Sequence, residues 1–192
     1  GITVQGCALD FAAVRARSER IVTTLRRGLR DVLRREGVEV IPGIASFDAP
    51  QRLVVTQAAG PQVVEAQRFI VATGARPLSG PWTCDEERIV SYRGLLSLSE
   101  LPSSLLIIGG GVIGCEFASI FSTFGTTVTI VEQQPQLLPA EDPEAVRWLA
   151  RRLQADGVTI LTGTTVQRLE ASATGVVATL EGSYDTVLYR FH

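Results

Sequence analysis

At 192 residues, the chain has room for one large domain or two small ones, and its 45% hydrophobic and 20% charged residues are ordinary for a globular protein. The formal net charge of −2 gives no reason to expect nucleic acid or an anionic membrane surface as a partner. Every basic residue is an arginine, which excludes a lysine nucleophile or a lysine Schiff base.

The cysteines Cys7, Cys84 and Cys115 are widely spaced and form no CxxC pair, so we expect neither a disulfide framework nor a metal site. All three are predicted to be small buried side chains of a cytoplasmic protein. The sequence has no methionine and no signal-peptide pattern, and we expect a fragment of a longer protein. Glycines and Glu116 interrupt its most apolar stretch, so no membrane span is expected.

Residues 10–36 predict one long amphipathic helix. Apolar side chains recur at three- and four-residue steps, and arginines occupy the opposite side. Asp10 is placed to cap the start of this helix, and Gly37 to end it. Acidic residues interrupt the arginine run, so a solvated helix face is favoured over a binding site for a polyanion.

Residues 38–72 predict short strands, in the runs "VEVI", "RLVVTQ", "QVVEAQ" and "RFIVAT", with turn-forming residues between them. We interpret them as one strand, a small antiparallel excursion, and a return strand at residues 69–72. Residues 76–102 contain prolines and no long periodic run, which is typical of a connection between two units. A short helix is predicted near residues 92–96.

A fresh βαβ pattern follows the connection. Two helices are predicted, at residues 112–124 and 143–156, the second with Ala145, Trp148, Leu149 and Leu153 on one side. The predicted strands are residues 105–108, 127–131, 158–161, 165–170, 176–181 and 186–189.

The segment "LIIGGGVIGCEF" predicts a phosphate-binding turn between a strand and a helix. Gly109 permits the tight turn, Gly111 lets the backbone approach a pyrophosphate, and Gly114 lets the helix pack on the strand. The start of the helix directs free N–H groups toward the phosphates. The next strand ends in Glu132, eighteen residues beyond Gly114, where an acidic side chain accepts hydrogen bonds from the adenosine ribose.

Glu132 predicts NAD rather than NADP, because a carboxylate repels a 2′-phosphate and the following Gln133 and Gln134 carry no positive charge. Glu116 lies in the first turn of the same helix. From composition alone, Glu116 is a carboxylate stabilised by the helix dipole.

The stretch "LPSSLLIIGGGVIGCEFASIFSTFGTTVTIVEQQPQLLP" closely resembles the NAD-binding domain of the flavoprotein pyridine nucleotide-disulfide oxidoreductases, and in particular the dihydrolipoyl dehydrogenase branch. "FIVATGARP" resembles the segment that returns the chain to the FAD domain in that family. The resemblance covers nearly the whole chain. It implies a Rossmann-like α/β fold in which residues 1–101 are the later part of a FAD-binding domain with its connection. Residues 102–192 are then an inserted NAD-binding domain, with a parallel sheet and an antiparallel meander.

The resemblance also implies binding roles. The NAD pyrophosphate and nicotinamide ribose are expected along Gly109, Gly110, Gly111, Val112, Ile113, Gly114, Cys115 and Glu116, the adenosine ribose at Glu132, and the adenine beside Val166. Val112 stands where many relatives carry a tyrosine, and Glu116 matches a carboxylate near the nicotinamide. FAD contacts are expected at Gly43 and at Thr73, Gly74 and Ala75. A turn glycine that follows a proline explains Gly43 equally well.

The implied protein is a homodimer in which a dithiol reduces an enzyme disulfide, electrons pass to FAD, and hydride leaves to NAD. The family's first GxGxxG, its CxxxxC disulfide and its His-Glu pair are absent from this sequence. No catalytic residue is therefore assigned, His192 included, and the chain alone is expected to be inactive. A stand-alone NAD(H)-binding module remains an alternative, as does a piece of a mercuric reductase, a transhydrogenase or an NADH oxidase.

Overall fold

The computed structural model describes residues 6, 8–77, 81–182 and 187–191, the last segment by its backbone alone. The chain forms two compact units, one of Gly1–Ala12 with Pro77–His192 and the other of Ala13–Arg76. Cys7 and His192 lie outside the described residues. Helices occur together with one parallel and two antiparallel sheets, which agrees with the predicted α/β class.

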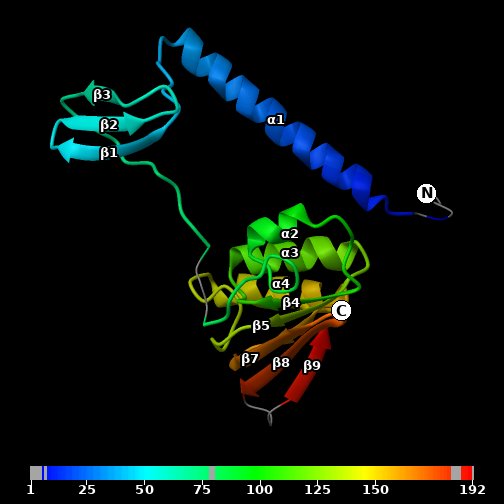
Figure 1. The fold of residues 1–192 in the computed structure, drawn as a ribbon. Coiled ribbons are helices and arrows are strands. Elements are labelled where there is room, and N and C mark those ends of the chain that lie inside the picture. The colour runs from blue at the N-terminus through cyan, green and yellow to red at the C-terminus, as the bar shows by residue number, and fades with distance from the viewer. Residues whose placement is uncertain (1–5, 7, 78–80, 183–186, 192) are drawn as a thin grey trace. The chain divides into compact units, whose positions relative to one another are not determined.

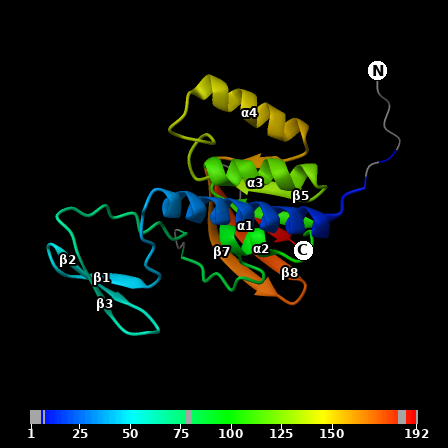
Figure 2. The same ribbon diagram turned by 90° about the horizontal axis from the view of Figure 1, so that it is seen from above.

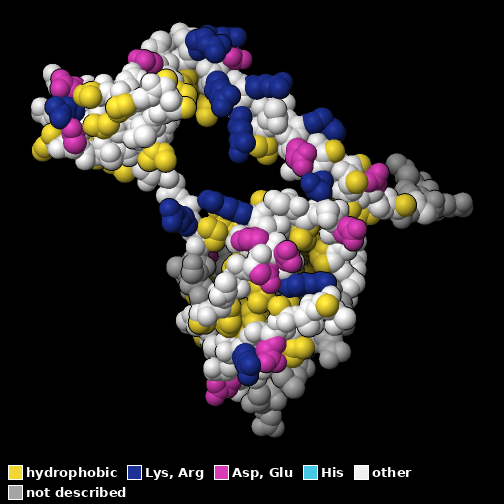
Figure 3. All heavy atoms as spheres, viewed as in Figure 1, with side chains coloured by type: hydrophobic (Ala, Val, Ile, Leu, Met, Phe, Trp, Pro, Cys, Tyr) yellow, Lys and Arg dark blue, Asp and Glu magenta, His cyan; other side chains and the backbone are white. Residues whose placement is uncertain are grey.

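Helix α1 (Phe11–Arg35) confirms the predicted amphipathic helix. It ends in a turn in which the Val38 N–H donates to the Leu33 carbonyl at 2.9 Å. All of α1 is described, and none of its residues is buried. Its arginines, dark blue in Figure 3, are therefore solvated as expected, while apolar residues such as Leu25 are exposed as well.

The unit Ala13–Arg76 also holds a small antiparallel sheet in the order β1-β2-β3. Its strands are β1 (Ile44–Ala49), β2 (Arg52–Thr56) and β3 (Gln62–Glu65). The predicted antiparallel excursion is confirmed at β2 and β3. The strand predicted at residues 38–41 is wrong, because the chain first completes the turn after α1 and begins to pair only at Ile44, opposite Thr56.

The return strand predicted at residues 69–72 is also wrong. These residues belong to none of the described sheets, and the Ile70 side chain is 96% exposed. Phe69 packs edge-on against Phe47 of β1 instead, with ring centroids 5.0 Å apart. A strand needs a neighbour that completes its hydrogen-bond ladder, and the apolar pattern of a segment does not report whether that neighbour is present.

The connection contains the predicted short helix, α2 (Tyr92–Ser97), which begins where the Ser91 hydroxyl accepts the N–H groups of Arg93 and Gly94. Cys84, which precedes this helix, is exposed, so the prediction that it is buried is wrong. Cysteine composition does not distinguish a connection from a core, and Cys84 falls in the connection.

The unit with the glycine loop is built on a parallel sheet in the order β4-β5-β6. Its strands are β4 (Ser104–Ile108), β5 (Thr127–Val131) and β6 (Thr159–Leu161). Helix α3 (Val112–Thr123) connects the first two and α4 (Pro143–Ala155) the last two. All five elements confirm the sequence prediction. An antiparallel meander follows, composed of β7 (Thr164–Ser172), β8 (Gly175–Gly182) and β9 (Val187–Phe191).

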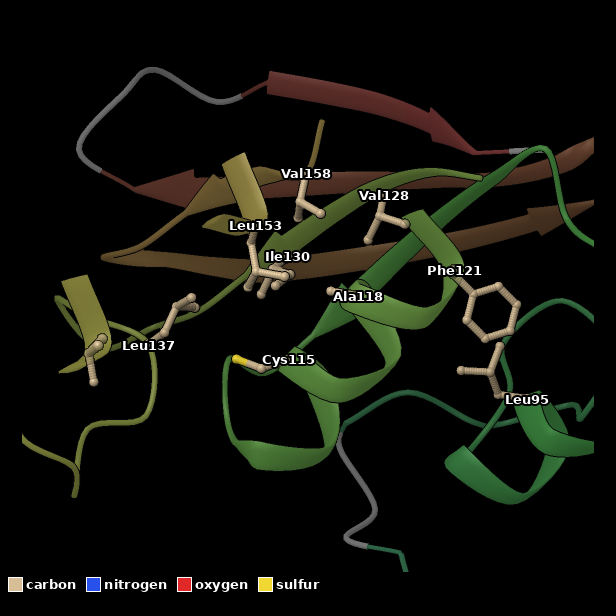
Figure 4. Close-up of a cluster of buried hydrophobic side chains, with 10 residues drawn as sticks. Leu95, Cys115, Ala118, Phe121, Val128, Ile130, Leu137, Leu153 and Val158 are labelled. Carbon is tan, nitrogen blue, oxygen red and sulfur yellow. The ribbon is translucent and has the colours of Figure 1, made fainter. Parts of the chain in front are cut away.

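Alternate residues of the parallel strands face two different layers. Val128 and Ile130 of β5 join α3 and α4 in one buried cluster, drawn in Figure 4. Val131 faces the other way and packs with Val166 of β7 and Leu180 of β8. The sheet therefore lies between helices and the meander, as Figures 1 and 2 show.

The buried face of α4 differs from the predicted one. Val146 and Leu153 are buried, whereas Ala145 is exposed and Trp148 is 67% exposed. The prediction grouped Ala145 and Trp148 with Leu149 and Leu153 on one side of the helix. The face of α4 that packs against the sheet is therefore shifted by about one residue along the helix relative to the predicted face. This shift places Val146 in the core.

Candidate dinucleotide site

The glycine loop, residues 109–114, begins directly after β4 and runs into α3. Gly109 has φ of +108°, a backbone conformation that side chains with a Cβ rarely adopt. Its N–H donates to the Val131 carbonyl at 2.8 Å, so the first residue of the loop is hydrogen-bonded to the neighbouring strand β5. The loop thus lies at the carboxyl end of a parallel strand and the start of a helix, which is the position the sequence predicts.

Both backbone polar groups of Gly110 form hydrogen bonds within the protein. Its N–H donates to Glu132 Oε2 at 2.6 Å, and its carbonyl accepts the Leu138 N–H at 2.9 Å. A Cβ on Gly110 would lie 2.4 Å from Leu137 Cδ2, so no larger residue fits without displacing that side chain. Gly110 is therefore buried between the segments that follow β4 and β5.

Gly111 and Gly114 differ in what surrounds them. A Cβ on Gly114 would lie 2.1 Å from the Gly109 carbonyl oxygen, so this glycine permits close packing of the helix on the loop. A Cβ on Gly111 would meet nothing within 4 Å. The open space at Gly111 lies at the start of α3, where the first N–H groups have no partner within the helix. An anion can approach the backbone there.

Glu132 follows β5, and its side chain is turned toward the glycine loop. The residue is only 8% exposed, which contrasts with the ordinary expectation for an acid at a strand end. Besides the Gly110 N–H, its carboxylate accepts the Gln134 N–H through Oε1 at 2.7 Å. Gln133 and Gln134 themselves are exposed.

The remaining predicted residues of α3 divide into exposed and buried ones. Val112, Ile113 and Glu116 are exposed, so they are accessible to a ligand. Cys115 is buried, and its Sγ lies 3.5 Å from the Gly110 carbonyl oxygen, which it contacts as a donor. Burial raises the pKa of the Cys115 thiol, and the nearby charge of Glu132 adds to this effect. Cys115 is therefore a structural neighbour of the loop, as predicted for a buried cysteine.

Val166 and the residues predicted to contact FAD lie elsewhere. Val166 of β7 is 5% exposed and contributes to the cluster between the parallel sheet and the meander. Gly43 precedes β1, and a Cβ on it would lie 2.5 Å from Val55 Cγ1, so close packing alone explains this glycine. Thr73, Gly74 and Ala75 are exposed, and with Gly43 they belong to the unit Ala13–Arg76, apart from the unit of the glycine loop.

The contribution of Leu137 and Leu138 was not predicted from the sequence. The Leu137 side chain is 2% exposed and lies next to Gly110, and the Leu138 N–H donates to the Gly110 carbonyl. A signal for this contact is present in the sequence. The apolar pair in "QLLP" comes only five residues after Glu132, which is too soon to belong to another strand or helix, so it indicates a loop that packs against the core.

Within the described part of the chain, no group of three or more His, Cys, Asp or Glu residues is arranged to hold a metal ion. None of the helices in that part is both long enough and apolar enough to cross a lipid bilayer.

The model of a protein family described as "Pyridine nucleotide-disulphide oxidoreductase" matches residues 3–190 of the chain. The chain belongs to this family. The dihydrolipoyl dehydrogenases of Bacillus subtilis and Zymomonas mobilis are 35% and 37% identical to it, over 86% and 95% of the chain. The matches cover 36% and 40% of those two proteins. The chain thus spans less than half the length of these relatives.

Two solved structures agree with this membership. LpdA from Mycobacterium tuberculosis superposes with a TM-score of 0.85 at 28% identity, over 96% of this chain and 41% of LpdA. The HOCl-induced flavoprotein disulfide reductase RclA from Escherichia coli gives a TM-score of 0.79 at 31% identity, over 94% of this chain and 41% of RclA. The predicted family is therefore confirmed.

Proposed function

We propose that residues 102–192 bind NAD(H) and that the chain is the central part of a FAD- and NAD-dependent disulfide oxidoreductase of the dihydrolipoyl dehydrogenase type. The observation that carries this proposal is the Glu132 carboxylate, turned toward a glycine loop that opens a helix after a parallel strand. The dihydrolipoyl dehydrogenases among the relatives support the reaction class. Residues 1–101 then contribute the later part of the FAD-binding domain and the connection.

The residues of the loop fit a dinucleotide. The pyrophosphate would lie against the backbone at Gly111 and the start of α3, where there is open space and the helix N–H groups are free. Glu132 would accept the hydroxyls of the adenosine ribose, and the backbone of β7 at Val166, whose side chain is buried, would lie beside the adenine. When bound, NAD supplies a hydride acceptor and FAD supplies the electrons that it receives. Glu116, which is exposed one helical turn after Val112, would lie near the nicotinamide.

A titration of the purified chain with NADH and NADPH, followed by nicotinamide fluorescence, tests this proposal. We expect NADH to bind at least about tenfold more tightly, because the carboxylate of Glu132 repels a 2′-phosphate. Equal affinity for the two dinucleotides would contradict the assignment of Glu132. Absence of binding by either would contradict the proposed site.

We further propose that the 192-residue chain binds NADH without oxidising it. A disulfide relay needs two cysteines that approach within bonding distance, but Cys84 is exposed in the connection and Cys115 is buried in α3. NADH-dependent turnover of a disulfide substrate by the purified chain, with a flavin absorbance band, would contradict this. In the dimeric parent protein, a GxGxxG and a CxxxxC encoded upstream would supply the remaining chemistry. Their absence would favour the stand-alone NAD(H)-binding module.

A further inference from the structure

Both carboxylate oxygens of Glu132 are bonded to the protein backbone. Oε2 accepts the Gly110 N–H at 2.6 Å and Oε1 accepts the Gln134 N–H at 2.7 Å, at a residue that is 8% exposed. One of these N–H groups belongs to the glycine loop and the other to the segment that follows β5. The side chain therefore connects the glycine loop to the segment after β5, 22 residues from Gly110 in the sequence.

The surrounding bonds determine which N–H groups are left for a phosphate. The Gly109 N–H donates to Val131, and the Gly110 carbonyl accepts the Leu138 N–H at 2.9 Å. The first two glycines of the loop are thus engaged within the protein. A phosphate must use the N–H groups from Gly111 onward, and the orientation of these groups follows from that of the Gly110 peptide.

We propose that Glu132 is a positioning residue for the phosphate site in addition to a ligand of the ribose. Its carboxylate holds the Gly110 peptide so that the next N–H groups face the phosphates before a dinucleotide arrives. The part of this inference that concerns binding rests on the proposed NAD(H) site. The two roles are compatible, because each carboxylate oxygen has a second lone pair that can accept a ribose hydroxyl.

The test is the Glu132→Gln variant of the full chain, with Glu100→Gln as the matched control at an exposed position. Glutamine has the same shape, but its NH₂ group would face one of the two N–H donors. In the ligand-free protein, we expect the amide of Gly110 or Gln134 to exchange with solvent at least about tenfold faster, the factor that corresponds to loss of one hydrogen bond to a charged acceptor. The Ile130 amide in β5 should exchange at the wild-type rate and so report an intact fold.

Reduced nicotinamide mononucleotide, which carries a phosphate but no adenosine ribose, separates the two roles. We expect Glu132→Gln to bind this probe at least about threefold more weakly than the wild type does, whereas Glu100→Gln binds it equally well. A variant that loses affinity for NADH alone, with wild-type exchange at Gly110 and Gln134, would overturn the inference and leave Glu132 a ribose ligand only.

Glu132→Asp decides the question if Glu132→Gln does not fold, which faster exchange at Ile130 would reveal. Aspartate keeps the charge but is one methylene shorter, so it cannot reach both N–H groups, and at least one of the two amides should exchange faster. Wild-type protection of both amides in a folded Glu132→Asp protein would overturn the inference. Because exchange is measured without ligand, this result does not depend on whether NADH binds, and a failure of the proposed function is recognised separately.

Discussion

The glycine loop at residues 109–114 is bonded to its neighbours on several sides, whereas residues 69–76 are mostly exposed. Each segment carries one of the two stretches that resemble the family. The loop meets β5, the segment after β5 and the packed side of α3, all of which lie within about thirty residues of it and are present in this chain. The pattern "FIVAT" has the composition of a buried parallel strand, but no described strand pairs with it.

A binding motif is therefore formed by its surroundings as much as by its own residues. A βαβ unit carries its own neighbours, since the strand, helix and second strand are consecutive in the chain. A strand that returns to a sheet depends on partners that are distant in sequence.

Leu153→Ala should have the largest effect. Leu153 of α4 is 1% exposed in the cluster of Figure 4, so its truncation should lower the free energy of unfolding by about 3–4 kcal/mol. Ile70→Ala is the matched control, because that side chain is 96% exposed and should change stability by less than about 0.5 kcal/mol. Urea unfolding followed by far-UV circular dichroism measures both. A large loss for Ile70→Ala would mean that residues 69–76 are buried in solution.

Gly114→Ala should destabilise the protein by about 1–3 kcal/mol, because the added methyl group would lie 2.1 Å from a backbone carbonyl that has little room to move. Gly28→Ala serves as the control, since a Cβ at that position in α1 meets nothing within 4 Å. Alanine there should leave stability unchanged or raise it by up to about 1 kcal/mol. Thermal and urea denaturation distinguish these outcomes, and similar effects of the two substitutions would count against the close packing of α3 on the loop.

Gly111→Ala should separate binding from stability. A methyl group has room at this position, so the free energy of unfolding should fall by no more than about 1 kcal/mol, the cost of alanine at a helix N-cap. The same methyl group would occupy the space through which a pyrophosphate approaches the backbone. NADH affinity, measured by fluorescence titration, should fall at least about tenfold. Unchanged affinity would show that the phosphates bind elsewhere.

The two described cysteines should differ in reactivity by a smaller factor, about threefold to tenfold, when labelled with iodoacetamide at pH 8. Cys84 is exposed, while burial and the charge of Glu132 raise the pKa of the Cys115 thiol and so reduce its reactive thiolate. Labelling of Cys115 should therefore rise further as the pH is increased above 8. Peptide mass spectrometry resolves the two sites, and equal rates in the native protein would contradict the burial of Cys115.

A large part of the fold could be predicted from the sequence because its signals are local. The apolar runs of β4 and β5, the glycine spacing and the helical period of α3 and α4 are patterns of residues that lie close together in the sequence. The same spacing located Glu132 relative to the loop. These features depend on backbone geometry and side-chain period, which a linear sequence contains.

Tertiary structure decided the remainder. It left residues 69–72 outside every described sheet and turned Trp148 of α4 toward solvent, because pairing and helix rotation depend on distant neighbours. It also directed the Glu132 carboxylate inward onto two backbone N–H groups, where spacing predicted only a ribose contact. Residue spacing predicted that Glu132 meets the glycine loop, whereas the contacts of Leu137 and Leu138 with the loop were not predicted. Only packing decided how these residues are bonded, since a hydrogen bond depends on direction and burial, which residue spacing does not specify.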